Sequence, residues 1–442
     1  MSVVRPVARI KSLLPDRVVI ELADLRLSLG DQIEFLGKSP RLTGEVVSLS
    51  QETAVIVVEG SIETLGLNDP VAPLGPFEIA PHESWIGRLI DPWGQPLDGE
   101  PLFQGKTFRA VSCSPPLAAS RRGLGVRLST GLMAFNTFLP LVRGQRIGLF
   151  AGAGVGKSTL IGTLANDLDA DVAVVGLVGE RGREVTAFVR QILGSKGMSR
   201  SVVVAATSDK PALTRRRAAL SAMAVAEHFR DQGKNVLLLI DSITRLAEAQ
   251  REIGAASGEA SSFRGFPPSV QPLLASLAER AGPGADGQGD ITAVLSVLVA
   301  GGDMDEPIAD TLRGVLDGHV ILSREIAERG RFPAIDLSRS VSRSLPEAAT
   351  KEQNFLIGEA RRVLSLYEKS EVMIRSGLYE PGTNPELDRA VSLFPELDAF
   401  IGKRSLCSIE ESFAEMGSIL NGTTQSGVPD SEAEKEQQSP EL

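Results

Sequence analysis

The residues with the clearest chemical signature form a short stretch that follows an apolar run and opens a segment of helical length. Its members are Gly152, Ala153, Gly154, Val155, Gly156, Lys157, Ser158 and Thr159. Glycines in such a P-loop let backbone N–H groups turn toward phosphate oxygens, and the helix N-terminus adds partial positive charge. The stretch therefore predicts a nucleotide site, with Lys157 on the terminal phosphates and the Ser158 hydroxyl on Mg²⁺.

Two acidic residues are expected beside this loop. Asp241 ends the apolar run 235–240, where a P-loop protein places a carboxylate that holds Mg²⁺ through water. Glu180 follows the apolar run 172–178 and is expected at the carboxyl edge of the same sheet. Hydrolysis needs a carboxylate that orients or deprotonates water, so Glu180 is the candidate. Glu184 is the alternative, and a solvated surface charge is the competing interpretation of either glutamate.

Segments that could position these side chains alternate between residues 143 and 341. Apolar runs of strand length are separated by segments of helical length, and the runs are 146–150, 172–178, 201–205, 236–240 and 291–298. This alternation predicts a mostly parallel sheet covered by helices on both faces.

The flanking regions differ in composition from this central part. Short β-branched runs between residues 3 and 73, separated by Asp, Gly and Pro, are typical of a small barrel or sandwich. Helical spacing dominates after Pro346, and the chain becomes polar and acidic near its end. The predicted fold class is α/β, with an N-terminal small β-barrel, a central P-loop domain and a C-terminal helical bundle. The predicted bounds are 1–74, 75–349 and 350–421, followed by a disordered acidic tail at 422–442.

Length, charge and composition exclude several classes of protein. A chain of 442 residues has room for about three domains. Its net charge of −10 and aromatic content of 5% argue against nucleic-acid binding, and the cluster 215–217 of three arginines is typical of a solvated helix face or an interface contact. Cys113 and Cys407 form no CxxC pattern, which favours a reducing compartment. No apolar run approaches the roughly 18 residues of a membrane span and no signal peptide is visible, so we expect only peripheral membrane contact.

An ordered set of motifs makes the chain resemble the rotary-type RecA-like ATPases, and among them most closely the flagellum-specific ATPases of the flagellar type III export apparatus. Besides the P-loop, the matching segments are 87–99, 179–185, 240–246, 264–270, 316–324, 332–336 and 340–343. The resemblance implies a central RecA-like domain, ATP hydrolysis with ATP and Mg²⁺ as cofactors, and a homo-oligomeric ring that is a homohexamer in this family.

The same resemblance implies catalytic roles for individual residues. Glu180 falls at the family's catalytic glutamate, and Arg181 at a contact to the γ-phosphate. Arg343 falls at the arginine finger that reaches into the neighbouring subunit's site, and Arg339 is a rival close in sequence. An arginine there would neutralise charge that develops on the transferring phosphoryl group.

The resemblance also implies that two aromatic residues contribute to the nucleotide pocket. Phe332 resembles an aromatic residue of the nucleotide pocket, and Tyr379 is expected to help close that pocket against adenine. Ordinary core packing is the alternative for each ring.

The resemblance also implies partners and a location. The expected partners are further copies of the chain, a negative regulator of the export ATPase, export-gate membrane proteins, and export chaperones with their cargo, but no nucleic acid. The expected location is the cytoplasm, with peripheral association to the inner face of the cytoplasmic membrane at the export apparatus.

Three other functions stay open: the ATPase of a virulence-type injectisome, a catalytic subunit of a rotary ATP synthase, and a RecA-like RNA translocase. Lys157, Glu180 and Arg343 occur together in one chain. One kind of subunit could therefore supply both sides of a shared site, which favours a homo-oligomer.

Overall fold

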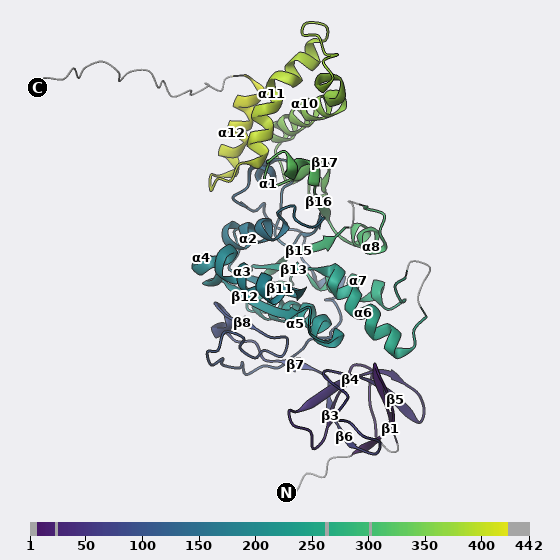
Figure 1. Ribbon diagram of the computed structural model, residues 1–442. Helices are drawn as coiled ribbons and strands as arrows, with labels where there is room; N and C mark the ends of the chain where they lie inside the picture. Colours follow the sequence, from purple (N-terminus) through teal and green to yellow (C-terminus); the bar gives the residue numbers. More distant parts are fainter. Residues whose placement is uncertain (1–6, 23–24, 261–264, 300–302, 423–442) are drawn as a thin grey trace, which may run out of the picture.

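The computed structural model describes residues 7–22, 25–260, 265–299 and 303–422, and it consists of three consecutive parts (Figure 1). A β-barrel lies at one end, an α/β core in the middle and a group of helices at the other end. The fold class predicted from the sequence is confirmed. Residues 423–442, which make up nearly all of the predicted acidic tail, lie outside the described residues.

The N-terminal part is a closed six-stranded barrel with the strand order β1-β2-β5-β4-β3-β6. Its strands are β1 (Ala8–Leu14), β2 (Arg17–Glu21), β3 (Gln32–Phe35), β4 (Leu42–Leu49), β5 (Thr53–Val58) and β6 (Pro70–Gly75). Alternate side chains point inward, and those of Val18, Ile20, Ile33 and Phe35 are buried. Pairing of β6 with β1 closes the sheet, so no strand edge is left open.

The central part is built on a sheet with the order β17-β16-β10-β15-β13-β11-β12-β8. The strands are β8 (Leu89–Ile90), β10 (Arg146–Ala151), β11 (Val172–Glu180), β12 (Ser201–Thr207), β13 (Val236–Asp241), β15 (Asp290–Leu298), β16 (Gly318–Leu322) and β17 (Ile335–Ser342). Strands β8 to β16 of this order pair in parallel, whereas β17 and the short β14 (Gly282–Pro283) pair antiparallel with their neighbours.

Helices cover both faces of this sheet, which explains the unbroken apolar runs in the sequence. In β11, Val175 and Leu177 belong to the hydrophobic core on one face, and Val174 and Val178 to the core on the other. The helical segments are α2 (Lys157–Asp167), α3 (Gly182–Ala187), the π-helical turn Phe188–Leu193, α4 (Gly194–Met198), α5 (Ala212–Asp231), α6 (Ile243–Ser257), α7 (Val270–Arg280), α8 (Pro307–Val315) and α9 (Arg324–Glu328).

The segment between barrel and core contains little regular structure, as its Pro and Gly content predicts. Strands β7 (Glu78–Ile79) and β9 (Arg109–Ala110) form a small ladder, followed along the chain by α1 (Met133–Thr137). The buried Trp85 anchors this segment, because its indole Nε1 donates a hydrogen bond to the Phe103 carbonyl oxygen at 2.7 Å.

The C-terminal part consists of α10 (Lys351–Arg375), α11 (Pro385–Gly402) and α12 (Ile409–Leu420). Capping boxes begin α10 at Thr350 and α12 at Ser408, and Pro385 occupies the first turn of α11. Among the described helices, none combines the length and apolar character that crossing a bilayer requires.

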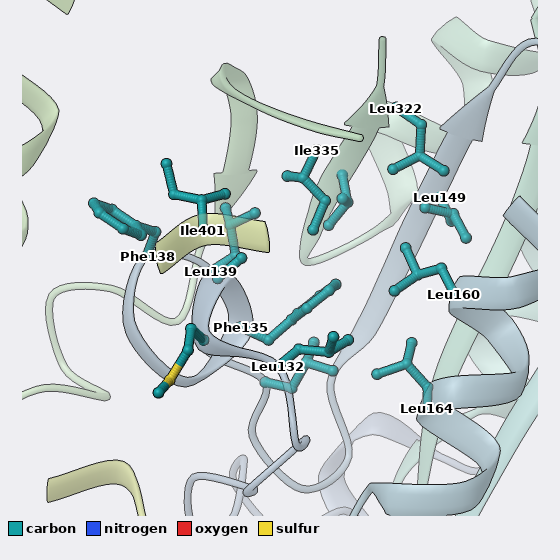
Figure 2. Packing of buried hydrophobic residues seen from close by; sticks show 14 of the residues in the cluster. Leu132, Phe135, Phe138, Leu139, Leu149, Leu160, Leu164, Leu322, Ile335 and Ile401 are labelled. Carbon is teal, nitrogen blue, oxygen red and sulfur yellow. The ribbon is translucent and has the colours of Figure 1, made fainter. Parts of the chain in front are cut away.

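A continuous hydrophobic cluster joins the phosphate-loop helix to the C-terminal helices (Figure 2). Leu160 and Leu164 of α2 face Phe135 of α1, and Ile401 of α11 lies on the other side of α1. The Phe135 ring is 1% exposed. The phosphate-loop helix α2 therefore shares one packed core with the C-terminal part.

Replacement of this central ring should destabilise the core measurably. We expect Phe135→Ala to lower the free energy of unfolding by about 3–5 kcal/mol, because it removes a buried ring and leaves a cavity. Calorimetric melting checks this. Phe355→Ala is the matched control, since that ring is 69% exposed, and equal melting temperatures for both variants would contradict the prediction.

Candidate functional site

The phosphate loop connects β10 to α2 at the carboxyl edge of the sheet. Gly156 is the N-cap residue of α2 and has a φ of 86°, in the left-handed region that favours glycine. A Cβ atom at this position would also lie 3.2 Å from the Phe332 ring, so both backbone and space require glycine. Val155 is buried and anchors the loop in the core, whereas Ala153 and Gly154 are exposed to a ligand.

Lys157 and Asp241 form an ion pair at this edge. Lys157 begins α2 and Asp241 ends β13, and Ser296 of the intervening strand β15 donates its hydroxyl to Asp241 Oδ1 at 2.7 Å. The Asp241 carboxylate is only 2% exposed, so it needs both partners to offset its desolvation. The structure thus brings together two residues that lie 84 positions apart in sequence.

Glu180 ends β11 at the same edge of the sheet as the Lys157–Asp241 ion pair. Together with Ser158 and Asp241 it lines a small cavity of about 160 Å³. Burial raises the pKa of Glu180 to about 7, and the negative charge of Asp241 adds to this effect, whereas the Lys157 ammonium opposes it. A carboxyl group with a pKa near neutrality is suited to exchanging a proton with water.

Arg181 and Glu184 lie at the rim, on the turn that leads into α3. The Arg181 side chain is 69% exposed and its Nη1 donates to Glu184 Oε1 at 3.1 Å. Burial acts to raise the pKa of Glu184, but hydrogen bonds with Glu180 and Arg181 outweigh it and hold the pKa below its ordinary value. Glu184 is therefore the carboxylate partner of Glu180, and the structure places Glu180 deeper in the site.

A cleft of about 930 Å³ surrounds these residues. The predicted residues that line it are Gly152, Ala153, Gly154, Gly156, Lys157, Ser158, Thr159, Glu180 and Arg181. Sequence reasoning missed the charged residues of its far wall, which are Arg215 on α5 and Arg245, Glu248 and Glu252 on α6. The i, i+3 and i+7 spacing of the three α6 residues, one turn after Asp241, was the signal that could have found them.

Phe332 lies against the outer side of the phosphate loop. Its ring is 52% exposed and lines a second cavity of about 370 Å³. The cavity is lined by Leu132, Gly154, Gly156, Thr159, Leu160, Thr163, Phe332, Pro333, Gly402 and Arg404. Thr159 lines both cavities, so a nucleotide with its phosphates on the loop has room for its base beside Phe332.

Tyr379 lies away from the phosphate loop, between α10 and α11. Its hydroxyl donates a hydrogen bond to Asp388 Oδ1 at 2.6 Å, and it lines neither of the two cavities. This local hydrogen bond within the helical hairpin holds the ring, so the structure does not bring Tyr379 to the other predicted site residues.

Arg343 and Arg339 lie on the outer side of the edge strand β17. Both are exposed, and neither lines the cleft of its own chain in the described residues. Arg343 follows the end of β17, and its Nη2 donates to the Arg313 carbonyl oxygen in the last turn of α8 at 3.2 Å. Arg343 is therefore exposed and lies outside the cleft of its own chain.

The oxygen donors at the site match the preferences of Mg²⁺. Ser158 and Asp241 line one cavity, and among the described residues no group of three or more His, Cys, Asp or Glu side chains could hold a metal ion. Mg²⁺ is usually bound by one or two protein oxygens together with phosphate oxygens and waters, so a hydroxyl and a carboxylate are a sufficient protein share.

Two family models match the chain. The nucleotide-binding domain of the ATP synthase alpha/beta family matches residues 131–342, and the T3SS EscN ATPase C-terminal domain matches residues 349–418. Together they span the α/β core from α1 onward and most of the C-terminal helices.

Several known proteins are similar over nearly the whole chain. A flagellum-specific ATP synthase of Caulobacter vibrioides is 45% identical over 407 residues, which cover 89% of this chain and 91% of the relative. One of Bacillus subtilis is 41% identical, with coverage of 91% and 93%. The assembled ATPase EscN of the enteropathogenic E. coli type III secretion system has a TM-score of 0.87 at 35% identity, covering 93% of this chain and 100% of EscN. EscN has also been solved in complex with its central stalk EscO, and that structure has a TM-score of 0.85.

Removal of the Phe332 ring should weaken nucleotide binding. We expect Phe332→Ala to raise the Kd for ADP about 5- to 150-fold, because an aromatic ring stacked on a base contributes about 1–3 kcal/mol. Isothermal titration calorimetry measures this. Phe332→Trp should keep most of the affinity and Phe355→Ala all of it, and a Kd unchanged in Phe332→Ala would show that the ring does not contact the base.

Proposed function

This chain belongs to the family of flagellum-specific ATP synthases, and on that premise we propose that it energises flagellar protein export as a homohexameric, Mg²⁺-dependent ATPase. It is an ATPase of type III protein export, and it assembles with copies of itself as EscN does. The observation that carries the mechanism is the convergence of four residues at one edge of the sheet: Lys157, Ser158 and Glu180 line the cleft, and Asp241 lines the adjoining small cavity and pairs with Lys157.

Lys157 can bind phosphate from its place at the edge of the sheet. Its Nζ forms an ion pair with Asp241. The β- and γ-phosphate oxygens offer the ammonium a stronger negative partner, and the loop amides at the α2 N-terminus add further donors. Asp241 and the Ser158 hydroxyl, which line one cavity, would hold Mg²⁺, and the metal would supply positive charge against the phosphate oxygens.

We assign the water-activating role to Glu180. Its carboxyl group lies deeper in the site than Arg181, and its burial gives it a pKa of about 7. The Lys157 ammonium lines the same cleft, and its charge favours the carboxylate form of Glu180. Glu180 can then accept a proton from the attacking water, while Arg181 at the rim contacts the γ-phosphate.

We assign the trans role to Arg343 of a neighbouring copy. Its side chain is exposed and, within the part of the chain that the structure describes, donates to the Arg313 carbonyl oxygen. An arginine supplied in trans is worth about 10³ to 10⁵ in rate in related phosphoryl transfers.

Flagellar export is favoured over an injectisome by sequence identity. A flagellum-specific relative is 45% identical over 89% of this chain, whereas EscN is 35% identical over 93% and a second type III secretion ATPase of pathogenic bacteria is 40% identical over 78%. The injectisome ATPase is the second candidate, because EscN shares the whole fold. We further propose the cytoplasm as the location, with peripheral contact to export-gate membrane proteins, and a negative regulator, export chaperones and cargo as partners.

Replacing Glu180 by the neutral isostere should separate binding from hydrolysis. We expect Glu180→Gln to lower kcat by at least about 10²- to 10⁴-fold, because the amide cannot accept a proton, while the Kd for ATP stays within about twofold. A steady-state ATPase assay and calorimetry measure the two quantities. A large loss of ATP affinity instead would make Glu180 a structural residue.

Mixing two inactive variants tests the shared site. A protomer with Arg343→Ala keeps Glu180, and a neighbour with Glu180→Gln keeps Arg343, so a mixed ring regains intact composite sites. With random equimolar mixing, about a quarter of the interfaces are intact, and we expect about that share of the wild-type ATPase rate.

The control is the same mixture made with Arg339→Ala. If Arg339 is the trans arginine, Arg339→Ala alone is inactive and complements Glu180→Gln, whereas Arg343→Ala alone is active. No recovery in either mixture, at protein concentrations where wild-type activity per protomer is constant, would contradict a shared site.

A further inference from the structure

Two of the three arginines at 215–217 join the N-terminal barrel to the core. Arg216 and Arg217 of α5 form ion pairs with Glu45 on β4 of the barrel, and Arg217 forms a second with Glu59, just after β5. We call these four residues the barrel–helix interface. The sequence interpretation of an interface contact is therefore right for Arg216 and Arg217, and that of a solvated helix face is wrong for them.

Burial makes this interface specific. Arg217 is 2% exposed, and its guanidinium lies over the ring of Phe77 at 4.2 Å, with Trp93 at 5.4 Å. Its partner Glu59 has a side chain only 3% exposed, and the Thr43 hydroxyl donates to it at 2.7 Å. Breaking one partner of a buried ion pair leaves an uncompensated charge, so these pairs oppose separation of α5 from the barrel.

Arg215, the preceding residue, reaches the catalytic cleft. Successive helix residues point about 100° apart, so one turn of α5 can face both barrel and cleft. Arg215 Nη2 pairs with Glu252 on the far wall at 2.6 Å. If Gly179 carried a Cβ atom, the Cδ atom of Arg215 would lie 3.6 Å from it. Gly179 has a φ of 70° and directly precedes Glu180.

Gly179 is the point where β11 departs from regular pairing. The register between β11 and β12 shifts between Val178 and Glu180. Arg245 of α6 approaches Gly179 from another direction, at 3.2 Å from the same hypothetical Cβ atom. The side chains of Arg215 and Arg245 therefore bound the space in which the backbone turns to present Glu180.

We propose that the barrel–helix interface positions Glu180: Glu45 and Glu59 hold the first turns of α5, and Arg215 in the same turn pairs with Glu252 on the cleft wall and bounds the space beside Gly179. The N-terminal barrel is thereby part of the catalytic apparatus of each protomer, through positioning residues that never touch the nucleotide. This inference rests on the proposed function of Glu180, because its consequence is a slower hydrolytic step.

The test compares Glu59→Gln with Glu21→Gln in the full chain. Glu21 is the matched control, since it is a barrel glutamate whose side chain is 63% exposed and whose ion pair with Lys11 is 3.7 Å long. We expect Glu59→Gln to lower kcat about 10- to 100-fold, as small displacements of reacting groups do, with the Kd for ADP unchanged. Rates are compared at concentrations where sedimentation shows equal ring assembly. Glu45→Gln, at a less buried position, serves if Glu59→Gln does not fold.

Two further readouts separate positioning from general stability. In this proposal Glu59 affects Glu180 through Arg215. The Glu59→Gln, Arg215→Ala double variant should therefore have a kcat no lower than that of the less active single variant. Hydrogen exchange over residues 176–184 should be faster in Glu59→Gln than in Glu21→Gln.

The outcomes are distinguishable. Unchanged kcat with Glu59→Gln and Glu45→Gln, additive losses, or unchanged exchange would each overturn the inference. A wild-type chain without ATPase activity would contradict the proposed function, and the exchange measurement would then still decide whether the barrel positions the Glu180 segment.

Discussion

Parallel pairing of β10, β15, β13 and β11 is the constraint on which the site depends. Parallel strands end at the same edge of a sheet, so the residues after them meet although they are far apart in sequence. The phosphate loop follows β10, Asp241 ends β13 and Glu180 ends β11. Burial of the sheet on both faces holds these strands rigidly, so the ends have little freedom to separate.

Two groups of charges lie at this edge of the sheet: the Lys157–Asp241 ion pair and the Glu180 carboxyl group. Lys157 begins α2 at the phosphate loop and pairs with Asp241, and both side chains are largely withdrawn from water. Glu180 lies beside this pair, and its pKa near 7 follows from burial close to Asp241. Strong charges held by the fold can thus act on a ligand without first being taken out of water.

Much of this site was predictable from local sequence. The phosphate loop, Asp241 and Glu180 each follow an apolar run, and these runs are buried strands. Two of the missed residues, Arg215 and Arg245, line the cleft from helices, where the sequence pattern of a charged residue is the same as on a solvated surface. Tyr379 was predicted to close the nucleotide pocket, but it bonds to Asp388 instead. That prediction depended on the distance between Tyr379 and the phosphate loop, which local sequence does not contain.

The sequence by itself determined the three-part architecture, the phosphate loop and the acidic residues after strands, because these depend on periodicity and on backbone conformations available to glycine. Only the tertiary structure decided which charges meet. It paired Lys157 with Asp241, placed Arg343 outside its own cleft and joined Arg217 to Glu59 of the barrel. The physical reason is that electrostatic partners are set by distance and burial in space, and residues separated by 84 or more positions acquire both only when the chain packs.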